Sequence, residues 1–229
     1  MRFAWGGVTH ETAVVQSQAL IDAALAAGVR RIVHVSITNP SSDSDLPYFR
    51  GKGRVEEFIR NCGMSYAILR PTVLFGHGDI LINNLAWILR HFPVFGMPGD
   101  GGYRMQPVFV EDFAALAVDS IDGSSNIAID AVGPEIYTFA ELLRMMKRTL
   151  GSNCRIIPMP PMIALAAAKA IGAVLGDVVL TADEVKGLMR NLLVSTEPPP
   201  CTTRLSEWLR QNADSVGAHY ESELALRRR

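Results

Sequence analysis

The sequence predicts an α/β fold with a mostly parallel sheet, followed by an α-rich second part. Two observations support this prediction. Helix-like and strand-like segments alternate with short loops up to residue 131, and helix-like segments dominate from residue 132 onward. The 229 residues are 48% hydrophobic and 20% charged, which is ordinary for a globular chain that can bury a core. We therefore expect two parts, residues 1–131 and residues 132–229.

The first four elements are predicted as helix, strand, helix and strand. Apolar residues recur at helical spacing over residues 9–27, and Gly28 stands where a helix commonly ends in the left-handed conformation. The short apolar run at residues 32–35 is typical of a buried strand. A second helix is expected to begin at Pro47, since the first helical turn does not need the missing N–H. Residues 67–69 predict the next strand.

The alternation continues over the next fifty residues. Residues 81–92 predict a helix, and the glycine-rich cluster at residues 98–102 predicts a hairpin turn because a strand follows it. Residues 108–110 predict a short strand that leads into a helix near Glu111. Residues 126–132 predict a further strand, which completes the expected sheet.

The second part shows clear helix starts. Thr138 and Thr181 are each followed three residues later by Glu, which is the spacing of a capping box. We expect the prolines at 158, 160 and 161 to separate two helices, and Pro198–Pro200 to form a stiff connector. The apolar stretch at residues 162–180 predicts a buried or partly buried helix. Shallow contact with a membrane or a partner helix is the alternative for this stretch.

Charge and cysteine content exclude several classes of function. The net charge is −1 and no basic stripe is present, so a nucleic-acid partner is not expected. The five histidines show neither i,i+4 pairing nor a Cys/His cluster, so no metal site is predicted. Three widely spaced cysteines and the lack of an apolar leader segment at the start favour a reducing, cytoplasmic location.

Tyr48 and Lys52 are the candidate catalytic pair. They lie four residues apart at the start of a predicted helix, so their side chains share one face. A free Tyr has a pKa near 10, and a neighbouring ammonium is expected to lower that pKa by favouring the phenolate. The pair suits proton transfer to a carbonyl oxygen, while the Lys can also bind a ribose hydroxyl. An ordinary exposed pair on a helix surface is the alternative.

Five stretches that include this pair resemble the atypical, extended short-chain dehydrogenase/reductase superfamily, with its NmrA-like and epimerase/dehydratase-like branches. They occur in the order typical of that superfamily, at residues 31–36, 48–52, 69–76, 106–112 and 131–134. Together with residues 180–185, they are most similar to the group that includes the NADPH-binding accessory subunit of respiratory complex I and its bacterial relatives. The resemblance implies a Rossmann-type NAD(P)-binding fold.

The resemblance also implies roles for individual residues. Tyr48 would be the acid/base or a ligand of the nicotinamide ribose, and Lys52 would bind the ribose and tune Tyr48. Many active relatives carry Ser or Thr one step beyond the strand-end Ser; this chain has Ile37 there, so Thr38 is the candidate substitute. The other residues expected at the cofactor are Ser36, Pro71, Thr72 and Val73. His77 and Arg104 would meet the substrate, or else belong to an ordinary polar loop and surface.

The glycine-rich turn that holds the pyrophosphate in such folds is not found ahead of these stretches. The resemblance places residue 1 near the end of the fourth strand, so roughly 80–90 residues, at about 30 per βαβ step, would precede it in the family. We therefore expect the C-terminal portion of a Rossmann-type sheet and weak NAD(P) binding by this chain alone. The expected function is that of a truncated oxidoreductase or epimerase. The alternative is a non-catalytic dinucleotide-binding module for redox sensing or complex I assembly, with a membrane-peripheral or respiratory-complex association.

Overall fold

The computed structural model of the protein describes residues 6–226. A three-stranded parallel sheet lies at its centre, in the order β1 (Arg31–Val35), β2 (Ser65–Pro71) and β7 (Ile127–Ala131). The middle strand β2 pairs with both neighbours, so that Ala67 lies opposite Val33 on one side and Ile127 on the other. The α/β prediction with a parallel sheet is therefore confirmed.

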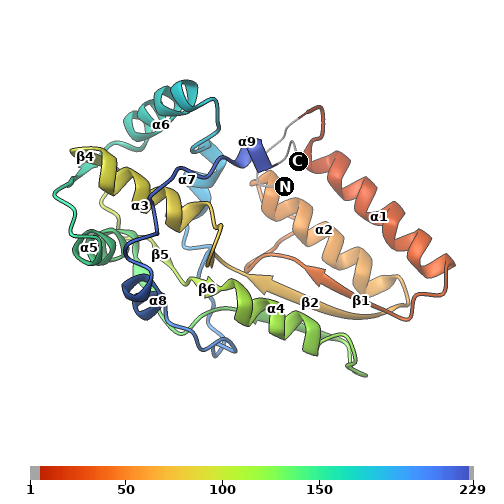
Figure 1. Ribbon diagram of the computed structural model, residues 1–229. Helices are drawn as coiled ribbons and strands as arrows, with labels where there is room; N and C mark the ends of the chain where they lie inside the picture. The colour runs from red at the N-terminus through yellow and green to blue at the C-terminus, as the bar shows by residue number, and fades with distance from the viewer. Residues whose placement is uncertain (1–5, 227–229) are drawn as a thin grey trace.

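Helices cover both faces of this sheet (Figure 1). One face packs against α1 (His10–Ala26) and α2 (Pro47–Asn61), and the other packs against α4 (Val110–Asp119). Neighbouring residues of β2 divide between the faces, because side chains alternate along a strand. Ile68 is buried with α1 and α2, whereas Leu69 is buried with α4.

Local signals explain where several helices begin. The Thr9 side chain accepts a hydrogen bond from the Thr12 backbone N–H at 3.1 Å, and Pro47 occupies the first turn of α2. Both predicted capping boxes are present, at the starts of α5 (Phe139–Thr149) and α7 (Ala182–Met189). Each box satisfies backbone N–H groups that have no partner within the helix.

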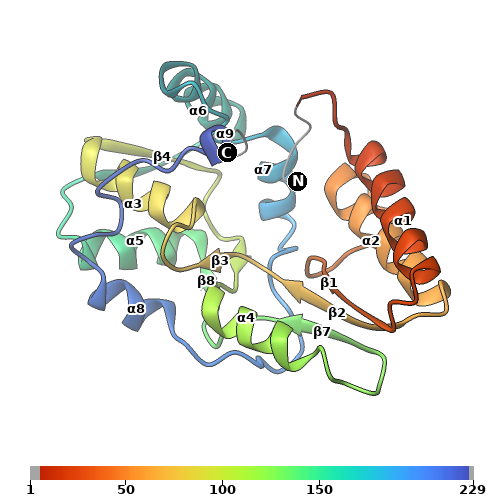
Figure 2. The ribbon, with the colours of Figure 1, turned by 45° about the vertical axis from the view of Figure 1, so that its right-hand side comes forward.

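The other half of the molecule contains the largest core (Figure 2). Its remaining helices are α3 (Leu81–His91), α6 (Pro161–Leu175), α8 (Leu205–Gln211) and α9 (Glu223–Leu226). The remaining strands form two-stranded sheets. β3 (Leu74–Phe75) pairs with β6 (Val108–Phe109), β4 (Val94–Pro98) pairs with β9 (Arg155–Met159), and β5 (Arg104–Met105) pairs with β8 (Tyr137–Thr138). The core packs α3 and β4 with α5 and α8, so it draws on both sides of the predicted division at residue 131. That division stays a prediction.

The pairing of β4 and β5 contradicts the hairpin turn that the sequence predicts at residues 98–102. Strand β4 pairs in parallel with β9, and β5 pairs with β8, so the glycine cluster after β4 does not join the two strands of a hairpin. The prolines at 158, 160 and 161 do separate two helices, α5 and α6, and Pro158 also lies in β9, opposite Met97. Each pairing joins segments distant in sequence, and no local pattern specifies such a partner.

Helix α1 also differs from the expected pattern. Val14 and Ile21 are buried against the sheet, but Leu20 is 72% exposed although it lies in the same predicted apolar set. A helix with only one neighbouring layer buries one narrow stripe, so the flanking apolar residues stay at the surface. Among the described helices, none combines the length and the apolar character that crossing a bilayer requires.

Candidate functional site

A cavity of about 880 Å³ lies beyond the carboxyl ends of β1 and β2. Its walls come from the first turns of α1 and α2, from the segment that follows β2, and from α7. Backbone hydrogen bonds continue the pairing of the two strands past their ends, from Ser36 N to Leu69 O at 2.7 Å and from Thr38 N to Pro71 O at 3.0 Å. In open α/β sheets, ligands bind outside the carboxyl ends of the strands, so this cavity is the candidate site.

Tyr48 is part of the wall of this cavity. Its ring packs edge-on against His10 and Phe49, with centroid distances of 5.9 and 5.7 Å. Burial raises the pKa of Tyr48 to about 12, the opposite of the expected lowering by a neighbouring ammonium. The phenol therefore keeps its proton at neutral pH and acts as a hydrogen-bond donor.

Lys52 lies on the next turn of α2. Its ammonium donates a hydrogen bond to the Val35 carbonyl at 2.7 Å, which ties it to the end of β1. Burial lowers the pKa of Lys52, while the nearby Glu56 carboxylate acts in the opposite direction. Lys52 does not line the large cavity.

A second, smaller pocket of about 110 Å³ brings Lys52 and Tyr48 together. His34 also lines it, and the His34 Nε2 atom is buried without a hydrogen-bond partner in the described part of the chain. Burial, assisted by the Lys52 charge, lowers the pKa of His34 to about 4, so this imidazole is neutral at pH 7. Tyr48 and His10 line both pockets.

The predicted hydroxyl residues after β1 do not reach the cavity. The Thr38 side chain is fully buried and donates to the Arg70 carbonyl at 2.9 Å. Ser36 is buried, and its hydroxyl makes no hydrogen bond of standard geometry within the described residues. Ile37, which stands between them, lines the cavity instead. An apolar side chain therefore occupies the wall where the relatives' hydroxyl was expected.

The segment after β2 meets the cavity in part. Thr72 and Val73 line it, whereas Pro71 is buried behind them. The Thr72 hydroxyl is already used, because it donates to the Gln106 carbonyl. Val73 thus offers an apolar surface against which a flat ring can pack.

Only one of the two candidate substrate residues lies at the cavity. His77 lines the cavity and its ring packs edge-on against Trp208 at a centroid distance of 5.8 Å. Arg104 is exposed on β5 and lies outside the cavity wall, where its backbone N–H donates to the Asn191 side chain at 2.6 Å. The structure therefore brings only His77 to the candidate site.

Asp79, two residues after His77, also lines the cavity. Its carboxylate accepts hydrogen bonds from the backbone N–H groups of Ile82 at 2.7 Å, Asn83 at 3.1 Å and Gly76 at 3.4 Å. Burial nevertheless raises the pKa of Asp79 to about 6. An Asp two residues before a predicted helix is a capping signal, and that signal could have identified this position.

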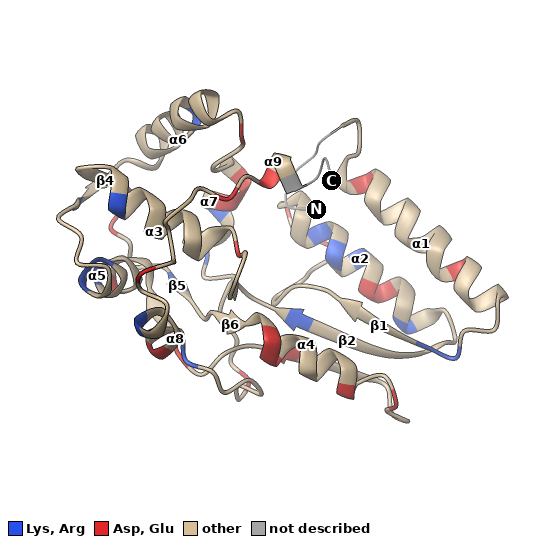
Figure 3. Ribbon diagram, viewed as in Figure 1, with Lys and Arg blue, Asp and Glu red and all other residues tan. Residues whose placement is uncertain are grey.

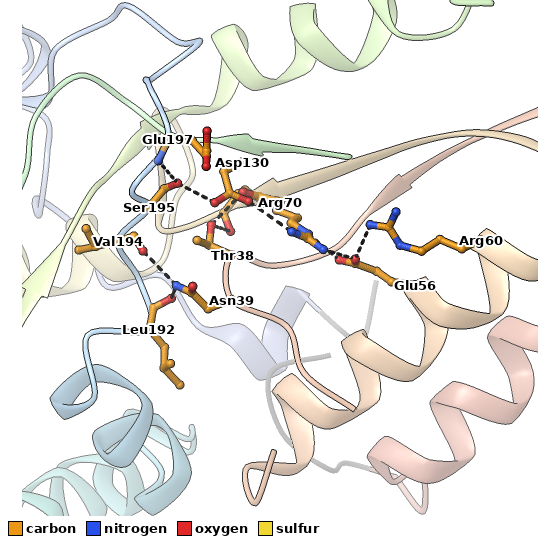
Figure 4. A network of polar contacts seen from close by, with 11 residues as sticks. Thr38, Asn39, Glu56, Arg60, Arg70, Asp130, Leu192, Val194, Ser195 and Glu197 are labelled. Carbon is orange, nitrogen blue, oxygen red and sulfur yellow. Dashed lines mark hydrogen bonds and ion pairs between the residues drawn. The ribbon is translucent and has the colours of Figure 1, made fainter. Parts of the chain in front are cut away.

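A polar network fixes the sheet end beside the cavity (Figure 4). Glu56 on α2 receives two hydrogen bonds from Arg70 on β2, at 2.5 and 3.0 Å. Asp130 on β7 accepts a hydrogen bond from the Ser195 hydroxyl at 2.6 Å, and Asn39 donates to two carbonyls of residues 192–194. These contacts hold the segment after α7 against the sheet, so α7 keeps its place over the cavity.

The comparison with known families decides the assignment. The sequence profile of the NmrA-like family matches residues 3–189. The chain belongs to the NmrA-like family. This assignment confirms the resemblance on which the sequence analysis relied, and it covers the sheet, the cavity and α7.

Curated relatives support the same group. The chain is 26% identical over 171 residues to the mitochondrial NADH-ubiquinone oxidoreductase 40 kDa subunit of Neurospora crassa, a match that covers 74% of this chain and 44% of that protein. It is 27% identical over 179 residues to the mitochondrial NADH dehydrogenase [ubiquinone] 1 alpha subcomplex subunit 9 of Arabidopsis thaliana, covering 73% and 44%. The chain therefore spans less than half the length of these relatives.

Solved structures confirm the Rossmann-type fold. The triphenylmethane reductase of Citrobacter sp. superposes with a TM-score of 0.72 at 18% identity, covering 92% of this chain and 74% of that one. The NADPH-dependent quinone oxidoreductase of Escherichia coli, solved with NADPH, gives a TM-score of 0.65 at 20% identity, covering 93% and 69%. The NmrA-like chain thus shares the fold of NAD(P)-binding reductases.

The described residues fit only one end of a dinucleotide. Tyr48, Thr72 and Val73 offer a hydroxyl and apolar surface to a ring and its sugar. Between residues 6 and 226, no Lys or Arg lines the cavity to neutralise a pyrophosphate. The turn at residues 76–78 links β3 to the N-terminus of α3 at the cavity and contains two glycines, but the Asp79 carboxylate already accepts hydrogen bonds from the first N–H groups of that helix.

Proposed function

We propose that this chain forms the nicotinamide-side and substrate-side part of an NAD(P)-dependent oxidoreductase or epimerase of the short-chain dehydrogenase/reductase type. One observation carries the proposal: Tyr48, Thr72 and Val73 line a single cavity at the carboxyl ends of parallel strands. A nicotinamide cofactor, when bound, supplies or accepts a hydride. The residues of this chain then have to orient the substrate, exclude water and hold a proton.

The protein side of this chemistry centres on Tyr48. With a raised pKa, the phenol donates a hydrogen bond and stabilises negative charge on a substrate carbonyl oxygen. Lys52, held by the Val35 carbonyl in the smaller pocket, keeps further N–H donors for a ribose hydroxyl that enters that pocket beside Tyr48. Ile37 and Phe49 line the same cavity and keep water away from it.

Saturation-transfer NMR with NADPH tests which end of the dinucleotide this chain contacts. We expect saturation on the nicotinamide and adjacent ribose protons and little on the adenine protons, because the described cavity lacks a phosphate cradle. Val73→Trp should abolish the transfer by filling the cavity wall, whereas Val118→Trp, on the exposed face of α4, should not. Circular dichroism would confirm that both variants fold.

Two results would contradict the proposal. One is a lack of transfer to nicotinamide protons at millimolar NADPH; the other is transfer that Val73→Trp leaves intact. Micromolar affinity of the isolated chain for NADPH would separately refute the expectation that it binds the dinucleotide weakly.

A second candidate function is a non-catalytic dinucleotide-binding module in a respiratory complex. It is favoured by the Thr38 hydroxyl, which bonds to the backbone, and by Ile37, which faces the cavity in place of a polar group. The respiratory-complex relatives support the same candidate. Tyr48→Phe discriminates the two in a longer protein that binds NADPH. A catalytic role requires loss of turnover, whereas a binding module keeps its NADPH affinity and has no turnover to lose.

A further inference from the structure

The cavity carries an uneven set of charges. Among residues 6–226, its lining includes five carboxylate side chains and no Lys or Arg; the acids are Glu11, Asp79, Asp183, Glu184 and Glu223. Figure 3 shows acidic positions on α7, on α9 and in the first turn of α1. Burial lowers the pKa of His10, so this lining imidazole is neutral at pH 7. The lining is therefore acidic.

Two of the five acids have cations nearby at the solvent side. Arg50 lies 3.2 Å from Glu11, and Lys186 lies 4.0 Å from Asp183, and both carboxylates are more than half exposed. Such exposed pairs are screened by solvent and contribute little. Of the residues that the structure describes, no Lys or Arg lines the interior of the cavity.

Asp79 is the more deeply placed acid. Its contacts are backbone N–H groups, and within the described residues no Lys or Arg forms an ion pair with it. The surrounding wall is apolar and includes Phe75, Ile80 and Val110. An apolar wall gives little screening, so the Asp79 charge acts on anything that enters the cavity.

A second feature indicates that a ligand belongs here. The Tyr48 hydroxyl lies at the cavity wall and makes no hydrogen bond within residues 6–226, although burial keeps the phenol protonated. Tyr48 is half-buried and its hydroxyl is open to the cavity, so it can donate a hydrogen bond to an acceptor on a ligand. The volume of about 880 Å³ is enough for a drug-sized molecule.

We propose that this cavity takes an apolar second ligand that is neutral or cationic, and that it rejects anionic analogues of the same shape. The inference rests on the proposed function, because it names the substrate class for the same site. The apolar wall supplies most of the affinity through burial, the Tyr48 hydroxyl donates to a ligand acceptor, and Asp79 sets the charge preference.

Two fluorescent probes test the charge preference directly. N-phenyl-naphthylamine is neutral, and anilinonaphthalene sulfonate has the same ring skeleton with one negative charge. We expect the full chain to bind the neutral probe at least about tenfold more tightly than the sulfonate. One negative charge ~10 Å from the sulfonate produces a difference of this size at an effective dielectric constant of about 20. Equal or tighter binding of the sulfonate would overturn the proposal.

Asp79→Asn tests the residue that sets the preference. Asn keeps an oxygen for the Ile82 and Asn83 N–H groups, so the start of α3 stays capped. We expect the ratio of the two affinities to fall several-fold in this variant and to stay unchanged in Asp119→Asn, at the exposed end of α4. Equal effects of the two substitutions would overturn the role of Asp79.

A blocking variant locates the probe. Leu188→Trp on α7 should abolish binding of the neutral probe, because Leu188 lines the cavity and is only partly buried. Unchanged binding would place the probe elsewhere and overturn the proposal. These titrations use no dinucleotide, so their failure is distinguishable from a failure of the NADPH experiment.

Discussion

Replacing Arg70 with Met should destabilise the protein strongly, because it leaves a buried carboxylate. The Glu56 side chain is only 3% exposed, whereas Arg70 is 25% exposed. Removing one partner of a buried ion pair costs about 3–5 kcal/mol of unfolding free energy. Arg60 lies 3.5 Å from Glu56 and retains some compensation, so we place the expected loss near the lower bound, about 3 kcal/mol.

Removing the other partner of the ion pair, Glu56, should lower the free energy of unfolding much less. Glu56→Gln leaves Arg70 partly in solvent, with Asp130 still 3.8 Å away, so we expect a loss of about 1 kcal/mol. The double variant removes the buried charge altogether and should be clearly more stable than Arg70→Met alone. Glu57→Gln, on the exposed side of α2, is the matched control and should change stability by less than about 0.5 kcal/mol.

The pH dependence has a defined sign. Burial on its own raises the pKa of Glu56, but the hydrogen bonds and charge of Arg70, with the charge of Arg60, bring the net pKa below its usual value. A carboxyl with a lowered folded-state pKa contributes stability above the unfolded-state pKa and loses it as pH falls through the folded-state pKa. Without Arg70 the pKa should rise, so the variant should be less stable at pH 8 than at pH 5, relative to wild type.

Urea unfolding followed by circular dichroism at both pH values measures these differences. At about 2–4 °C per kcal/mol for a chain of this size, Arg70→Met should lower Tm by roughly 6–12 °C. A loss below 1 kcal/mol, or a double variant as unstable as Arg70→Met, would refute the reasoning.

Further expected outcomes concern α1, α2 and the cavity. Gly53→Ala should destabilise by more than about 2 kcal/mol, since its Cβ would lie 2.4 Å from the Ser42 backbone nitrogen, whereas Gly51→Ala, whose Cβ meets only ordinary contacts, should be neutral or stabilising in thermal melts. The pKa of Asp79 is raised to about 6 in the folded protein, so the protonated carboxyl stabilises the fold below the unfolded-state pKa of 3.8. This stabilisation is lost as the pH rises through about 6. Asp79→Asn should therefore gain stability relative to wild type by up to about 3 kcal/mol between pH 4 and pH 8 in urea titrations, and a pH-independent difference would contradict this. Leu20→Glu should change stability by less than about 0.5 kcal/mol, because the side chain is 72% exposed, and a larger loss would show that this face of α1 is covered.

The sequence by itself determined the local elements of this protein. Pro47 and the Thr-x-x-Glu spacings marked the starts of three helices, and the apolar runs at 32–35 and 67–69 marked two paired strands. The order of its motifs was enough to identify the family that the comparisons confirm. These features depend on residues within a few positions of one another, or on motif order alone.

Only the tertiary structure decided which of these residues meet. Strand β9 pairs with β4 across some sixty residues, and Asp79 lines the same cavity as residues of α7 and α9. The pKa of Tyr48 rises because the ring is buried, and the Lys52 ammonium is bonded to the Val35 carbonyl. Burial and partner choice depend on segments far apart in the chain, and neither spacing nor composition specifies them.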